Sequence, residues 1–161
     1  MGRLMTKKFK FDQPSLKWDR RGLIRAEQVS RFSKDPVKFE GAVLWDHEHV
    51  PIMEAFNGMS HNLLDLPARV SKPELRALLG HTAIDNCLWL AARHASHRIE
   101  GSTLFSYPLA PTVRDATLII RARCARVIYQ VHSRLEEAPN LTAKRLLEEC
   151  GIECVEMGLV K

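Results

Sequence analysis

The chain has 161 residues, of which 45% are hydrophobic and 27% are charged. This length is close to that of one globular domain and is long enough to bury a core, so a second domain is not expected. The formal net charge of +5 permits an acidic partner such as a nucleotide and gives weaker support to a nucleic acid. Part of this charge lies at the beginning of the chain. We therefore predict a flexible basic leader over residues 1–14 and a single domain over residues 15–161.

The sequence gives no sign of a membrane segment or of a secreted protein. No apolar run is long enough for a membrane helix, and no signal-peptide core follows the first charges. We therefore expect a cytoplasmic protein with no membrane partner. The four cysteines, at positions 87, 124, 150 and 154, do not form the C-x-x-C pair of many zinc sites. We expect free thiols, with Cys87 and Cys124 buried as small apolar side chains.

Helical and strand periodicities alternate along the chain. In chain order we expect a helix that ends at residue 32, strands at 42–45 and 50–55, a turn at Asn57-Gly58, a loop and a short helix over 67–80, a buried helix at 84–96, a strand at 102–106, a helix at 112–122, a strand at 125–130, a helix at 141–150 and a strand at 153–157. The first two strands suggest a hairpin, and the next two flank a helix as a parallel βαβ unit. This order predicts an α/β fold, a three-layer α/β/α sandwich with a mixed sheet of about five strands.

Several short segments, taken in order, carry a resemblance to a known family. They are Trp18-Asp19, Ser33-Lys34-Asp35-Pro36, Gly41-Ala42-Val43-Leu44, Ala55-Phe56-Asn57-Gly58-Met59, Ser102-Thr103-Leu104-Phe105, Arg126-Val127-Ile128-Tyr129 and the run from Ala143 to Glu153. Over residues 16–157 the chain resembles the cytidine and deoxycytidylate deaminase family. The resemblance implies a cytidine deaminase-like fold. Active members of that family use zinc to remove the exocyclic amine of a cytosine or adenine base.

The first zinc motif of that family is degenerate in this chain. The family motif H-x-E supplies a histidine ligand and a glutamate that shuttles the proton. Alignment on Asn86 places Thr82 at the histidine position and Ile84 at the glutamate position. Alignment on His81 restores the histidine but places Ala83 at the glutamate position. Both registers remain open, and the glutamate is absent in each.

The second zinc motif is degenerate as well. The family motif P-C-x-x-C corresponds to the sequence Pro111-Thr112-Val113-Arg114-Asp115, so Thr112 and Asp115 replace the two thiolates. Tight zinc binding depends on such soft ligands. We therefore expect no metal and no cofactor, although the resemblance implies zinc. His81, Asp85 and Asp115 are the candidates for a harder metal site or for acid–base catalysis. Both aspartates are also explained as charges near helix N-termini.

The substrate side of the family site is partly retained. Asn57 matches the asparagine that contacts the nucleoside sugar in the family, although Asn-Gly is also an ordinary turn sequence. We include Thr82, Thr112 and Arg114 among the candidate nucleotide-binding residues. The Pro-Arg-Gly run that helps deoxycytidylate deaminases to bind phosphate reads Met59-Ser60-His61 here. A phosphate would therefore need another cation, such as Arg69, Arg76 or Arg114.

Three functional hypotheses follow from these substitutions. The favoured one is a deaminase-like protein that has lost catalysis and binds a nucleotide or acts as a scaffold. Such a protein would form a homo-oligomer, or a hetero-oligomer with an active deaminase-like subunit. The first alternative is a zinc-independent enzyme that acts on a nucleotide or nucleobase. The second is an active dCMP-type deaminase with atypical metal ligands. The sequence leans against an enzyme and identifies neither ligand, partner nor pathway.

Overall fold

A mixed five-stranded sheet forms the centre of the computed structural model, which describes residues 16–60, 62–130 and 137–158. Its strands are β1 (Gly41–Trp45), β2 (Pro51–Phe56), β5 (Thr103–Tyr107), β6 (Arg126–Gln130) and β7 (Glu153–Met157). Their order is β2-β1-β5-β6-β7. Strand β1 is antiparallel to β2 and β5, whereas β5, β6 and β7 are parallel. The predicted hairpin and the predicted parallel βαβ unit are both confirmed.

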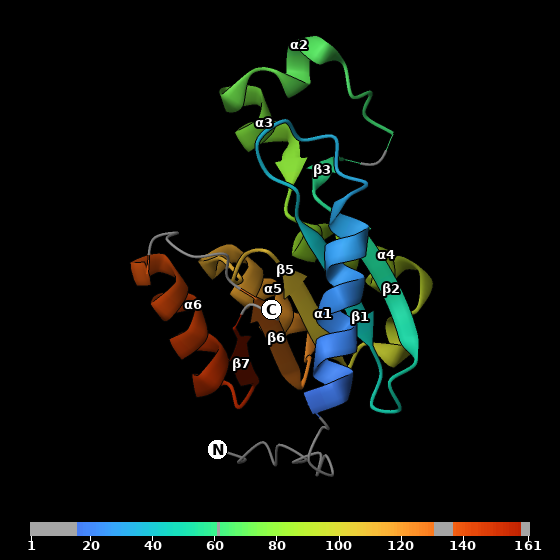
Figure 1. Ribbon diagram of the computed structural model, residues 1–161, viewed down its shortest axis with the longest axis vertical. Coiled ribbons are helices and arrows are strands. Elements are labelled where there is room, and N and C mark those ends of the chain that lie inside the picture. The colour runs from blue at the N-terminus through green and yellow to red at the C-terminus, as the bar shows by residue number, and fades with distance from the viewer. Residues whose placement is uncertain (1–15, 61, 131–136, 159–161) are drawn as a thin grey trace, which may run out of the picture.

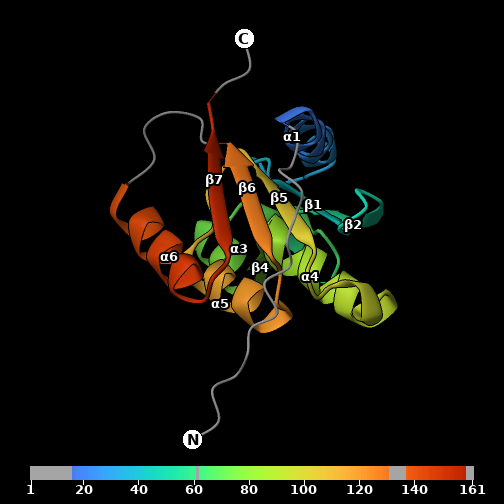
Figure 2. The ribbon, with the colours of Figure 1, turned by 90° about the horizontal axis from the view of Figure 1, so that it is seen from below.

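Helices cover both faces of this sheet (Figures 1 and 2). The covering helices are α1 (Leu16–Ser30), α4 (Ala83–His94), α5 (Val113–Ala122) and α6 (Glu137–Glu149). Figure 2 shows α1 on one side of the sheet and α4, α5 and α6 on the other. Strand β1 separates two cores because its side chains alternate. Val43 and Trp45 pack in the core of α1, and Ala42 and Leu44 pack in the core of α4 and α5. The predicted three-layer sandwich is confirmed.

Close packing and one buried ion pair hold α1 on its face of the sheet. A methyl group at Gly22 would overlap the ring of Phe105, so only glycine permits this approach of α1 to β5. Near the start of the same helix, the Asp19 carboxylate accepts two hydrogen bonds from the Arg126 guanidinium of β6, each of 3.1 Å. Both side chains are buried, and Arg126 also donates to Glu153 of β7 at 2.6 Å. These contacts tie the first helix to the last two strands.

The region between β2 and α4 differs from the expected loop and single short helix. It contains a second sheet of two short antiparallel strands, β3 (Gly58–Met59) and β4 (Gly80–His81). It also contains two short helices, α2 (Pro67–Val70) and α3 (Pro73–Leu79), each of which begins with a proline. Proline is well suited to the first helical turn because its missing N–H has no partner there. Strands of two residues show no alternation of apolar and polar side chains, so the sequence pattern could not reveal them.

Smaller differences concern element ends and single residues. Helix α1 ends at Ser30, before the expected residue 32, and α6 begins at Glu137, before the expected residue 141. All four cysteines are free: Cys87 and Cys124 are buried, Cys154 is partly buried and Cys150 is exposed. Burial raises the pKa of Cys124 to about 11. The predicted leader over residues 1–14 lies outside the described residues. Among the helices that the structure describes, none is both long and apolar enough to span a membrane.

Candidate functional site

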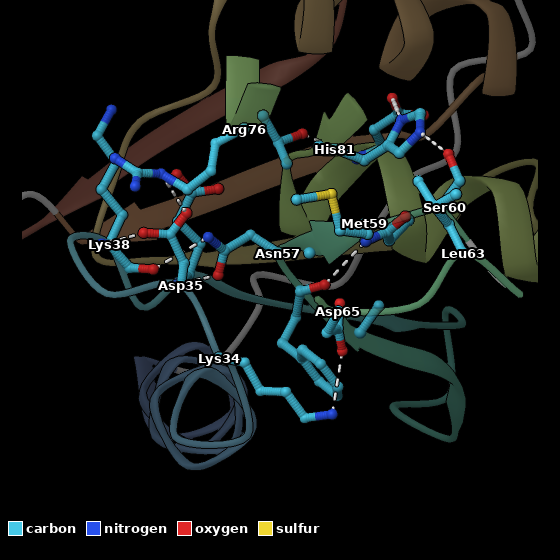
Figure 3. A pocket seen from close by; sticks show the side chains of 18 of the residues that line it. Lys34, Asp35, Lys38, Asn57, Met59, Ser60, Leu63, Asp65, Arg76 and His81 are labelled. Carbon is cyan, nitrogen blue, oxygen red and sulfur yellow. Dashed lines mark hydrogen bonds and ion pairs between the residues drawn. The ribbon is translucent and has the colours of Figure 1, made fainter. Parts of the chain in front are cut away.

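A cavity of about 1000 Å³ lies beside α4, β2 and the small β3–β4 sheet (Figure 3). This volume is at the upper end of the range for small-molecule sites. Its charged lining residues are the cations Lys34, Lys38, Arg76 and Arg93, and the anions Asp35, Glu40, Glu54, Asp65 and Asp85. Two of the cations are paired, Lys34 with Asp65 at 3.0 Å and Arg76 with Asp35 at 3.6 Å. Cationic and anionic side chains are therefore nearly balanced around the cavity.

The residues that the alignment on Asn86 places at the zinc positions are hydrogen-bonded to one another. The Thr82 hydroxyl donates to Asp115 Oδ1 at 2.6 Å, and the Thr112 hydroxyl donates to Asp115 Oδ2 at 2.7 Å. The backbone N–H of Thr112 donates to the same Oδ2 at 2.9 Å. Thr82 caps α4 and Thr112 caps α5, the latter in a reciprocal capping box with Asp115. We call Thr82, Asp115 and Thr112 the Thr-Asp-Thr network. It fastens the N-termini of the two helices together.

This donor set does not fit the zinc ion of the deaminase family. A catalytic zinc site takes three protein ligands from cysteine, histidine and carboxylate side chains. Here Asp115 is the only such side chain of the network, and its two oxygens already accept three hydrogen bonds. Across the described residues, no group of three or more histidine, cysteine, aspartate or glutamate side chains is placed to hold a metal ion.

His81 forms a separate chain of hydrogen bonds at the cavity wall. Its Nδ1 lies 2.7 Å from Asp85 Oδ2, and its Nε2 lies 2.7 Å from the Ser60 hydroxyl. Figure 3 shows the His81 and Ser60 side chains meeting. The Arg114 guanidinium, 80% exposed, approaches Asp85 to 4.0 Å. The structure thus brings His81 and Asp85 together and places Asp115 in the Thr-Asp-Thr network.

The candidate nucleotide-binding residues do not all line one cavity. Asn57 and Thr82 line the large cavity, Thr82 and Thr112 line a small neighbouring one, and Arg114 lines neither. Asn57 is only 6% exposed. Its side-chain amide accepts a hydrogen bond from the Glu40 N–H at 2.9 Å and donates one to the Lys38 carbonyl at 3.0 Å. Asn57 therefore holds the segment before β1, and its contact with a sugar stays a prediction.

Glu40 is a site residue that the sequence analysis did not identify. It lines both cavities, and the smaller one, of about 20 Å³, also contains Thr82, Thr112 and Asp115. Its carboxylate accepts a hydrogen bond from the N–H of Ala83, at the start of α4, at 3.3 Å. Burial raises the pKa of Glu40, and the charge of Asp115 adds to this effect, whereas the Ala83 N–H and Lys38 oppose it. No pattern in the sequence marks Glu40, because it lies in a segment that only the fold places beside α4.

Replacing Glu40 by glutamine is expected to stabilise the protein at neutral pH. Because the pKa of Glu40 in the folded protein lies above its ordinary value of 4.5, ionisation costs more in the folded than in the unfolded chain. The free energy of unfolding of the wild type therefore falls as the pH rises from about 4.5, the ordinary pKa, through the higher pKa of the folded protein. The glutamine variant has no carboxyl group at this position and does not show this loss. Urea unfolding at pH 4 and pH 7.5 should show an advantage of Glu40→Gln that is larger at pH 7.5. Glu48→Gln, at an exposed position, should show no such difference, and equal curves for Glu40→Gln and wild type at both pH values would contradict the prediction.

Comparison with known proteins finds similarity only to solved structures. No protein-family model and no curated protein matches the chain. The dCMP deaminase of the cyanophage S-TIM5 superposes in its apo form with a TM-score of 0.70 and 18% identity, over 89% of this chain and 100% of that chain. The same enzyme in complex with dCMP and dUMP superposes with a TM-score of 0.71 and 20% identity, over 89% of this chain and 99% of that chain. The Rib2 deaminase of Aspergillus oryzae, as a C-terminal deletion mutant, superposes with a TM-score of 0.59 and 11% identity, over 88% of this chain and 85% of that chain. The chain therefore has the cytidine deaminase-like fold that its sequence segments indicate.

Proposed function

We propose that the protein is a deaminase-like protein without zinc-dependent deaminase activity, and that it binds a nucleotide or acts as a scaffold. The Thr-Asp-Thr network carries this proposal. In the alignment on Asn86, these residues take the three ligand positions of the family with groups that satisfy each other's hydrogen bonds. The two candidate positions for the proton-shuttling glutamate hold Ala83 and Ile84, which are both buried and apolar. Neither side chain can transfer a proton.

The large cavity supports nucleotide binding. Trp89 of α4 lines it and is 47% exposed, and the Arg93 guanidinium lies 5.5 Å from the centre of the Trp89 ring. An exposed aromatic face is suited to stacking with a base. The near balance of charge around the cavity favours a nucleoside or a monophosphate over a triphosphate, which would bring several negative charges. The S-TIM5 dCMP deaminase of the same fold has been crystallised with dCMP and dUMP, so these monophosphates are the first ligands to try.

A deamination assay with zinc tests the loss of catalysis. Full-length protein produced with ample zinc would be analysed for metal content and incubated with dCMP, and dUMP formation would be followed by chromatography. We expect far less than one zinc per chain and no dUMP, while an active dCMP deaminase in a parallel reaction verifies the assay. One zinc per chain together with turnover would overturn the proposal in favour of an active deaminase with atypical ligands.

Replacing Trp89 by alanine is expected to weaken dUMP binding by about tenfold, because a stacked base contributes about 1–3 kcal/mol. Trp89→Phe keeps an aromatic face and should bind much more like the wild type. Isothermal titration calorimetry with dUMP gives both dissociation constants. If the alanine variant bound as tightly as the wild type, Trp89 would not be part of the binding surface.

A protein partner is supported by apolar side chains around the two short helices. Leu64, Leu66 and Leu78 are 68%, 43% and 76% exposed. This part of the chain stands at one end of the molecule, away from the central sheet (Figure 1). Exposed apolar side chains on a projecting segment are suited to contact with a partner. Light scattering coupled to size-exclusion chromatography would detect the homo-oligomer, and co-purification with an active deaminase-like subunit would detect the hetero-oligomer.

A zinc-independent enzyme is the second candidate function. The contact between His81 and Asp85 favours it, since a histidine oriented by a carboxylate is a common acid–base arrangement. Such an enzyme would use the large cavity as its substrate site.

A further inference from the structure

We propose that Ser60, His81 and Asp85 act as nucleophile, general base and orienting carboxylate in the hydrolysis of a carboxylic ester bound in the large cavity. This inference rests on the second candidate function, the zinc-independent enzyme, and does not require that the cavity binds a nucleotide. A serine, a histidine and an aspartate joined in this order perform acyl transfer on several unrelated folds.

The two ring nitrogens of His81 have the partners that this chemistry requires. Nε2 lies 2.7 Å from the Ser60 hydroxyl oxygen, and Nδ1 lies 2.7 Å from Asp85 Oδ2. An ionised carboxylate can only accept hydrogen bonds, so the Nδ1 of His81 carries a proton. In a neutral imidazole the other nitrogen, Nε2, then has a free lone pair. With His81 in this neutral form, the Ser60 hydroxyl is the donor in its bond to His81, which is the arrangement of a nucleophile beside its base.

Regular structure holds His81 and Asp85, and β3 ends directly before Ser60. The β3–β4 pairing sets Gly58 opposite His81 and Met59 opposite Gly80, which brings Ser60, the residue after β3, beside His81. Asp85 lies in the first turn of α4, where the helix dipole favours a negative charge, and its N–H donates to the Thr82 hydroxyl at 3.1 Å. A site held by strands and a helix keeps its geometry better than one held by loops alone.

Access to substrate distinguishes this constellation from a buried hydrogen-bond network. All three residues line the large cavity. Ser60 is exposed, and the side chains of His81 and Asp85 retain exposures of 30% and 19%. A nucleophile at the wall of a cavity of about 1000 Å³ can meet a carbonyl carbon, whereas a fully buried serine such as Ser102 cannot.

The reaction balances with water as the only co-substrate. The Ser60 oxygen bonds to the ester carbonyl carbon as its proton passes to His81 Nε2. The bond from that carbon to the alkoxy oxygen then breaks, and the leaving alcohol takes the proton from Nε2. Water next attacks the acyl-serine, giving a proton to Nε2. The acid departs as that proton returns to the Ser60 oxygen, so one ester and one water yield one acid and one alcohol.

A structural role for the same hydrogen bonds predicts a different chemistry. If they only fasten the small sheet to α4, Ser60 is no more reactive than any other exposed serine. A fluorophosphonate probe tests this directly, because the serine oxygen forms a bond to phosphorus as fluoride leaves. The full-length protein would be treated with the probe, and the labelled peptide and the labelling rate would be determined by mass spectrometry.

We expect about one label per chain, on Ser60, and none on that peptide in Ser60→Ala. Asp85→Asn and His81→Gln should each slow labelling at least tenfold, since a positioned base contributes about 10²- to 10⁴-fold. Ser71→Ala, which changes an exposed serine at the end of α2, should label at the wild-type rate. Thermal unfolding of each variant verifies that it is folded. If His81→Gln does not fold, the labelling rate of Asp85→Asn alone tests the role of the base.

An unlabelled Ser60 in the folded wild type, or a rate unchanged in both Asp85→Asn and His81→Gln, would overturn the proposal. Hydrolysis of p-nitrophenyl acetate gives the second readout, and turnover that persists in Ser60→Ala would also overturn it while leaving a zinc-independent enzyme with another nucleophile. Binding of dUMP to Ser60→Ala, measured in parallel, keeps the nucleotide-binding proposal separate from this one.

Discussion

Replacing Asp19 by alanine is expected to lower the free energy of unfolding by about 3–5 kcal/mol, because it leaves a buried charge without its partner. Arg126 is only 4% exposed, and Asp19 accepts hydrogen bonds from both of its terminal nitrogens. Burial lowers the pKa of Arg126, but the hydrogen bonds and charges of Asp19 and Glu153 outweigh this and raise it. An arginine side chain is not deprotonated in proteins, so the guanidinium stays charged in the variant, with half-exposed Glu153 as its remaining ion-pair partner among the described residues.

Two further variants make this test specific for the buried pair. Glu153→Gln changes a side chain that is 55% exposed, and it should cost far less than Asp19→Ala. The double variant Asp19→Leu with Arg126→Met removes both charges, and it should be more stable than Asp19→Ala because no buried charge remains unpaired. Urea unfolding of the three proteins measures these differences. If Asp19→Ala and Glu153→Gln cost the same, Asp19 would have no special role in holding α1.

This ion pair also shows what a sequence can and cannot predict about the fold. Asp19 is recognisable as part of a helix and of a family segment, and β6 is recognisable as an apolar strand. Asp19 and Arg126 are separated by 107 positions in the sequence. No local sequence pattern predicts that two residues so far apart will pair. Short apolar runs predict the strands at residues 42–45 and 50–55 because each run has enough residues to stand out from the polar residues that join them. Strands β3 and β4 have two residues each, so they emerge only in the structure.

The candidate site follows the same rule. Thr82, Thr112 and Asp115 could be placed in one site because family motifs mark them, and the structure brings them within hydrogen-bonding distance. Ser60 and Glu40 belong to segments whose sequence carries no motif of their own. Ser60 reaches His81 through the pairing of β3 with β4, and Glu40 reaches α4 because Asn57 holds the segment before β1. Residues placed by loops and short strands are those that sequence reasoning misses.

Replacing Asp115 by alanine is expected to lower the free energy of unfolding by about 2–3 kcal/mol, which combines the loss of a helix cap with partly buried donors that lose their acceptor. Asp115 is 3% exposed. Without it, the hydroxyls of Thr82 and Thr112 and the N–H of Thr112 lose their acceptor. Asp115→Asn keeps one acceptor oxygen and should cost less. Urea unfolding of the two variants measures both effects, and an alanine variant as stable as the wild type would show that the network does not hold the helices together.

A chelator turns this stability measurement into a test of what Asp115 does. A metal ligand and a hydrogen-bond acceptor both destabilise the fold when they are removed, so the variant alone does not distinguish them. A bound metal stabilises the folded state by mass action, and a strong chelator would then lower the unfolding temperature of the wild type but not that of Asp115→Ala. We expect the chelator to change neither, because the carboxylate is already occupied by the hydroxyls and the N–H of its neighbours. If the chelator lowered the unfolding temperature of the wild type but not that of Asp115→Ala, Asp115 would be a metal ligand. That result would favour the alternative of an active deaminase with atypical metal ligands.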